Sequence, residues 1–153
     1  MIKWKNLIIS IAISLGVGLL SSLLTMGNQN IYEIINVPSF APPGWLFPIV
    51  WTILYILMGI SSYIIYEEND INSSSALKVY GLQLFVNFFW SIIFFNLKNF
   101  TFAFIWIILL LFLIIVMIYR FANINKLAAY LNIPYLLWVA FASVLNLSIV
   151  LLN

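Results

Sequence analysis

The chain has 153 residues, of which 65% are hydrophobic and only 7% are charged. A water-soluble globular protein is about one-quarter charged, so this composition excludes that class. The small net charge of +2, without a basic cluster, excludes a nucleic-acid partner. Cysteine and histidine are absent, so we expect neither a metal site nor a bound cofactor. The composition predicts an all-α membrane protein, a single domain built as a bundle of about five transmembrane helices.

The first apolar run predicts a helix over about residues 6–26, after Lys3 and Lys5. The run is too long for the apolar core of a signal peptide, so we expect it to be retained. Small residues recur along it at four-residue steps, which favours close packing against a neighbouring helix of the same chain over a dimer contact. These residues are Ser10, Ser14, Gly18 and Ser22.

A long polar segment follows the first helix. Residues 27–42 are polar and irregular, and connections of this length often act as lids over a site. The second helix is expected over about residues 43–66, with Pro43 in its first turn. Pro48 should kink this helix or interrupt its hydrogen bonds locally.

Three further helices are expected over about residues 76–97, 100–121 and 128–152. The fourth helix is apolar on all sides, which is typical of an anchoring helix that faces lipid.

The positive charges predict how the bundle crosses the membrane. With five spans, Lys98 lies on one side, and the other side holds Lys3, Lys5, Lys78, Arg120 and Lys126. Because cytoplasmic loops are enriched in Lys and Arg, we expect a cytoplasmic N-terminus and a C-terminus outside. The composition suggests the plasma membrane of a bacterium.

Polar and aromatic side chains share one face on each of three helices. These faces carry Trp51, Tyr55 and Gly59; Gln83, Asn87 and Trp90; and Tyr135, Trp138, Ala142 and Asn146. An amide in hydrocarbon needs a hydrogen-bond partner, so the faces should point into the bundle. Two interpretations stay open: polar contacts between helices around an aromatic core, or a pocket in which Gly59 and Ala142 leave room for a flat ligand stacked between indoles.

The same positions resemble the TspO/MBR family of tryptophan-rich sensory and translocator proteins. The resemblance covers most of the chain and rests on several motifs. They are Pro38-Ser39-Phe40-Ala41-Pro42-Pro43-Gly44-Trp45, Phe47-Pro48-Ile49-Val50-Trp51-Thr52, Leu54-Tyr55, Met58-Gly59, Gln83-Leu84, Asn87, Trp90-Ser91, Phe94-Phe95, Pro134-Tyr135, Trp138, Phe141-Ala142 and Leu145-Asn146.

The resemblance implies a membrane receptor or sensor that binds porphyrins and similar flat apolar ligands in a pocket under the first loop. Family members also often form homodimers. From the resemblance and the spacing together, the expected ligand-binding residues are Tyr32, Trp45, Trp51, Asn87, Trp90, Tyr135, Trp138, Ala142 and Asn146.

Two other functions remain open. Some bacterial members of that family are reported to degrade porphyrins in light, and in such an enzyme Trp51 and Trp138 would be the catalytic residues. A transporter of tetrapyrroles or lipid-like molecules is the third hypothesis. The predicted spans carry no acid at membrane depth for ion coupling, which counts against secondary active transport.

Overall fold

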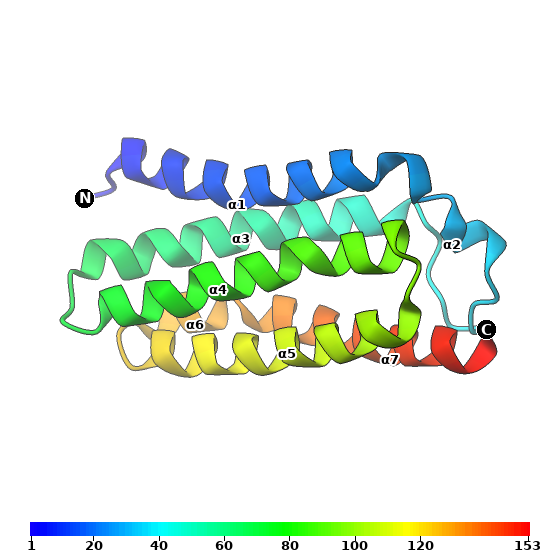
Figure 1. The fold of residues 1–153 in the computed structure, drawn as a ribbon. Coiled ribbons are helices and arrows are strands. Elements are labelled where there is room, and N and C mark those ends of the chain that lie inside the picture. The colour runs from blue at the N-terminus through cyan, green and yellow to red at the C-terminus, as the bar shows by residue number, and fades with distance from the viewer.

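The structure is a computed structural model that describes residues 1–153. Five long helices run side by side along one axis (Figure 1). They are α1 (Trp4–Thr25), α3 (Leu46–Glu68), α4 (Ser73–Ser91), α5 (Phe100–Ala122) and α7 (Ile133–Leu152). No strand is present, and all five helical segments are long and apolar enough to span a membrane. The predicted all-α bundle of five transmembrane helices is confirmed.

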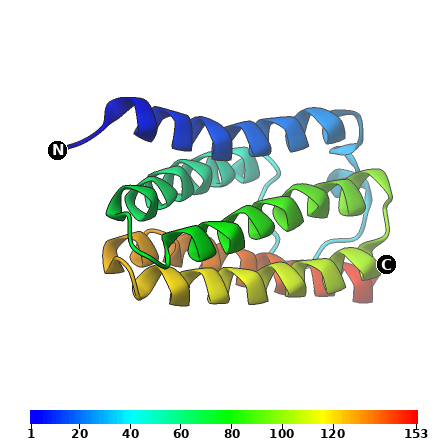
Figure 2. The same cartoon turned by 60° about the vertical axis from the view of Figure 1, so that its left-hand side comes forward.

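Four short elements complete the chain. They are η1 (Met26–Asn28), α2 (Ile31–Ile34), the π-helix η2 (Ile92–Asn96) and α6 (Lys126–Tyr130). Figures 1 and 2 show α2 and the C-terminus at one end of the bundle and the N-terminus at the other. The end that holds α2 is called the α2 end below.

Close packing of α1 on α3 depends on two glycines. A Cβ on Gly59 would meet the backbone of Ile11 on α1 at 2.5 Å, and a Cβ on Gly18 would run into the ring of Tyr55. Ser14, also on α1, donates to the carbonyl of Tyr55 at 2.6 Å. Gly59 therefore admits a neighbouring helix and not a ligand, which differs from the expectation that it leaves room in a pocket.

Two helix boundaries differ from the expected ones for identifiable reasons. The second span begins at Leu46 and not at residue 43, so Pro48 falls in its first turn, where a missing N–H breaks no bond. The helix is consequently continuous through Pro48. The expected helix over 128–152 divides into α6 and α7 just before Pro134, which lies in the first turn of α7 and lacks the N–H that a continuous helix would need. At the break, Asn132 donates its side-chain amide to the carbonyl of Ala128 and to Ser61 on α3.

Candidate ligand-binding cavity

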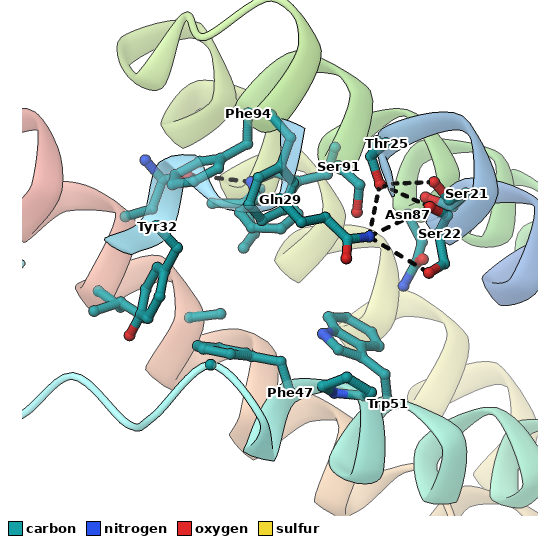
Figure 3. Close-up of a pocket in the computed structure, with 18 of the residues that line it drawn as sticks. Ser21, Ser22, Thr25, Gln29, Tyr32, Phe47, Trp51, Asn87, Ser91 and Phe94 are labelled. Carbon is teal, nitrogen blue, oxygen red and sulfur yellow. Dashed lines mark hydrogen bonds between the residues drawn. The ribbon is translucent and has the colours of Figure 1, made fainter. Parts of the chain in front are cut away.

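A cavity of about 450 Å³ lies among α1, α3, α4, α5 and α7 near the α2 end of the bundle (Figure 3). The connection between α1 and α3 also contributes to its lining, with Gln29, Asn30, Tyr32, Glu33 and Gly44. A volume of this size is ordinary for a small-molecule site. The first interhelical connection thus closes one side of an internal space rather than running free over the surface.

One wall of the cavity is aromatic. Phe47 and Trp51 come from the first turns of α3, where they face inward beside Tyr32 of α2 (Figure 3). The ring of Phe47 lies edge-on to Tyr32 at 5.2 Å and to Trp138 of α7 at 5.7 Å between ring centroids. These rings offer broad apolar faces, and aromatic pairs add specific geometry to the area they bury.

The opposite wall carries hydroxyl and amide groups. The last two turns of α1 present Ser21, Ser22 and Thr25, and Gln29 reaches back over them (Figure 3). The Gln29 Nε2 atom donates to Thr25 Oγ1 at 3.2 Å and to the Ser22 carbonyl at 3.3 Å. An aromatic wall facing a polar one suits a flat molecule with polar groups along one edge.

A buried hydrogen-bond network lies at the inner end of the cavity. Tyr55 donates to Asn87 Oδ1 at 2.5 Å, and Asn87 Nδ2 donates to the Tyr135 hydroxyl at 2.8 Å. The Tyr135 hydroxyl in turn donates to Gln83 Oε1 at 2.6 Å. The network joins α3, α4 and α7 and supplies the interhelical partners that the sequence required for these amides. Gln83 and Tyr135 are internal, as polar contacts between helices require, and Asn87 also lines the cavity.

Two indole groups differ in their hydrogen bonding. Trp90 Nε1 donates to Asn146 Oδ1 at 3.1 Å, and Asn146 Nδ2 donates to the carbonyl of Phe100 at 3.0 Å. Trp138 Nε1, by contrast, is buried and has no partner. An unpaired buried donor costs free energy, and this N–H is enclosed by protein atoms and does not face the cavity.

The π-helix η2 shapes the wall next to Trp90. Its wider turn brings both Phe94 and Phe95 to the cavity lining, and Trp90 stacks on Phe94 at 5.1 Å between ring centroids. Such single π-turns inside helices occur frequently at functional sites. The sequence motif Phe94-Phe95 had no periodicity that predicted this change of helical pitch.

Among the 25 lining residues, Glu33 is the single charged one. No cluster of acidic residues could hold a metal ion. Burial raises the pKa of the Tyr32 hydroxyl, which remains a neutral donor to the Pro42 carbonyl at 2.7 Å. The cavity can therefore stack and hydrogen-bond a ligand, and it offers no cationic group.

Seven of the nine expected ligand-binding residues line this cavity: Tyr32, Trp51, Asn87, Trp90, Trp138, Ala142 and Asn146. The other two do not. Trp45 is 68% exposed on the outside of the α2 end, and Tyr135 is 1% exposed within the network behind Asn87. Sequence reasoning missed the polar wall and Glu33. Ser22 belonged to the recognised small-residue stripe, but nothing in the spacing indicated that Thr25 or Gln29 would face the same space.

The chain is similar to known proteins over nearly its whole length. The profile of the TspO/MBR family matches residues 10–152. The tryptophan-rich protein TspO of Archaeoglobus fulgidus is 40% identical over 149 residues, which cover 97% of each chain. A tryptophan-rich sensory protein of Cereibacter sphaeroides is 31% identical over 80% of this chain and 76% of its own. The translocator protein of Sus scrofa is 35% identical over 87% of this chain and 80% of its own. With its five membrane-spanning helices, the chain belongs to the TspO/MBR family.

Proposed function

We propose that this protein is an integral membrane receptor that binds porphyrins and similar flat apolar ligands in the cavity among its helices. The observation that carries the proposal is the pairing of an aromatic wall, containing Trp51 and Trp138, with a polar wall from α1. A tetrapyrrole is flat, apolar on its faces and polar at its edges, so the two walls suit its two kinds of surface. One similar protein is named a sensory protein and another a translocator protein, and binding is the step that both names require.

Stacking by the two indoles is tested with a double variant. Titration of purified protein with protoporphyrin IX should quench tryptophan fluorescence with saturation. Trp51→Phe/Trp138→Phe should weaken the affinity about tenfold, because two aromatic contacts worth roughly 0.7 kcal/mol each are reduced. Trp4→Phe is the matched control, since Trp4 is exposed at the far end of the bundle. Equal affinities for the double variant and the wild type would refute the assignment of this cavity.

The first connection acts as a lid in this proposal. Its middle is held by reciprocal hydrogen bonds with Asn153: the Asn36 backbone N–H donates to Asn153 Oδ1 at 3.1 Å, and Asn153 Nδ2 donates to the Asn36 carbonyl at 2.8 Å. Its beginning is held by Asn28, which donates to Asn96 Oδ1 at 2.8 Å. Ligand exchange at the α2 end would require this connection to move.

The proposed orientation sets the lid outside the cell membrane and the N-terminus in the cytoplasm. Its support is the distribution of cations, since Lys98 alone belongs to the connections at the α2 end. Protease digestion of sealed vesicles, with tags at each terminus, tests this orientation. In right-side-out vesicles, external protease should cleave the C-terminal tag and spare the N-terminal tag; the reverse pattern would contradict the orientation.

A light-dependent degradation of the bound porphyrin is the second candidate, because the indoles of Trp51 and Trp138 both line the cavity. Illumination of the complex in air, followed by porphyrin absorption, separates the two functions. Product formation that depends on these two tryptophans would indicate an enzyme. Bleaching at the same rate in the double variant would indicate binding alone.

A further inference from the structure

The cavity has an unusual charge pattern for a site that would take a ligand with carboxylates. Its lining contains hydroxyls, amides, indoles and phenols, one carboxylate and no Lys or Arg. We propose that the site prefers flat ligands without free carboxylates. In this proposal Glu33 is a specificity-determining residue, because its negative charge disfavours a ligand carboxylate at the mouth of the cavity. This inference rests on the proposed function, and it narrows the ligand class to neutral or esterified tetrapyrroles and similar neutral molecules.

The cavity lining does not compensate the charge of a ligand carboxylate. A carboxylate moved from water into the cavity loses hydration, and only a cation or several strong donors would offset that loss. The amide of Asn87 is engaged by Tyr55 and Tyr135, and that of Asn146 by Trp90 and Phe100. These two buried amides are thus engaged within the protein, and the lining has no cation to receive an anion.

The one charged residue in the lining is acidic. Glu33 lies on α2 at the mouth of the cavity, where it is exposed and makes no ion pair. The ion pair in the structure joins Lys3 to Glu67 at the opposite end of the bundle. Lys98 belongs to the connection between α4 and α5 and does not line the cavity. A ligand carboxylate near the mouth would therefore meet an uncompensated negative charge.

The cavity offers a neutral hydrogen-bond donor. Trp51 lines the cavity, is half-buried, and its Nε1 donates no hydrogen bond to the protein; an indole N–H is a neutral donor with no acceptor function. It matches a neutral acceptor, such as an ester or ketone carbonyl or a ring nitrogen. The indole donor and the negative charge of Glu33 thus both favour neutral ligands.

The experiment compares protoporphyrin IX with its dimethyl ester, which differ in their two carboxylates. Affinities are measured by tryptophan quenching for the wild type, Glu33→Gln and Glu33→Lys in nanodiscs of an uncharged lipid. Partition of each probe into lipid is the same for every variant, so the ratio of the two affinities across variants isolates residue 33. Glu68→Lys is the matched control, because it makes the same charge change on an exposed residue at the far end of α3.

We expect the wild type to prefer the ester. Glu33→Gln should strengthen diacid binding by about two- to fivefold, the range of an exposed charge interaction, and Glu33→Lys should strengthen it by a similar factor again. Ester binding should not change, and high salt should reduce the differences. Unchanged diacid affinity in Glu33→Lys, with ester binding intact, would overturn the inference while leaving the proposed function standing. Failure of both probes to bind the wild type would instead overturn the proposed function, and this inference with it.

Discussion

Trp90 on α4 and Asn146 on α7 are joined by a 3.1 Å hydrogen bond from the indole Nε1 to the amide Oδ1. The bond crosses the bundle at the wall of the cavity, and the same amide anchors the first residue of α5 through the Phe100 carbonyl. One side chain therefore holds three helices at the site. Its geometry leads to the first prediction.

Asn146→Leu should destabilise the protein by about 1–3 kcal/mol, because it leaves the Trp90 N–H without its acceptor and the Phe100 carbonyl without this donor. The measurement is the free energy of unfolding in mixed micelles. Leucine keeps most of the volume, so loss of packing contributes little. An unchanged unfolding free energy would show that water or lipid replaces both bonds.

The buried network should behave as a unit. Asn87→Leu removes the acceptor of Tyr55 and one of the two partners of Tyr135, whereas Tyr135→Phe removes one hydroxyl from the middle of the network. We expect Asn87→Leu to cost about 1–3 kcal/mol, because the buried Tyr55 hydroxyl loses its acceptor. The double variant should cost less than the sum of the single ones, since the two residues share a bond. Strict additivity in this double-mutant cycle would contradict a connected network.

Two glycines provide a matched test of helix packing. Gly59→Ala should destabilise the bundle by about 1–3 kcal/mol, because the new Cβ would collide with the backbone of Ile11. Gly81→Ala is the control: a Cβ there meets nothing within 4 Å, and alanine favours helix by about 0.5–1 kcal/mol. The free energies of unfolding should therefore move in opposite directions. Equal effects at the two sites would contradict the described contact of α1 with α3.

The hydrogen bonds that join Asn36 to the end of α7 should slow ligand dissociation. Asn36→Ala removes the hydrogen bond from Asn36 Nδ2 to the Leu152 carbonyl, so the connection between α1 and α3 is held less firmly against α7. We expect ligand dissociation to become about fivefold faster, as loss of one bond of roughly 1 kcal/mol allows, with little change in stability. Stopped-flow fluorescence measures the rate. Asn72→Ala, in the connection between α3 and α4 at the opposite end, should leave the rate unchanged.

The five spans could be predicted from the sequence because each is a long apolar run bounded by polar or proline-containing segments. The break between α6 and α7 was not predicted, although Pro134 at the start of α7 is a local signal for it. The hydrogen bond from Asn132 to Ser61, seventy-one residues earlier in the chain, could not be predicted from local sequence. The small residues of α1 did indicate close packing, and Gly18 and Ser14 provide it against Tyr55.

The candidate site was also predicted only in part from the sequence. Helical spacing placed Asn87 and Trp90 on one face and Trp138, Ala142 and Asn146 on another, and these faces meet at the cavity. Spacing alone could not separate a residue that lines the cavity from one just behind it, which is the position of Tyr135. Trp45 precedes the first turn of α3, where the backbone direction, not a helical period, decides that the indole points outward.

The central claim is that a flat ligand occupies the cavity among the helices. Ala142 lines the cavity and is 8% exposed, whereas Val144 is 55% exposed on the outer face of α7. Ala142→Phe would place a ring inside the cavity, and Val144→Phe adds a similar ring outside it. Protoporphyrin IX binding in nanodiscs, measured for both variants, is the most direct test. We predict that Ala142→Phe abolishes saturable binding and that Val144→Phe binds as the wild type does; wild-type affinity in Ala142→Phe would contradict the account.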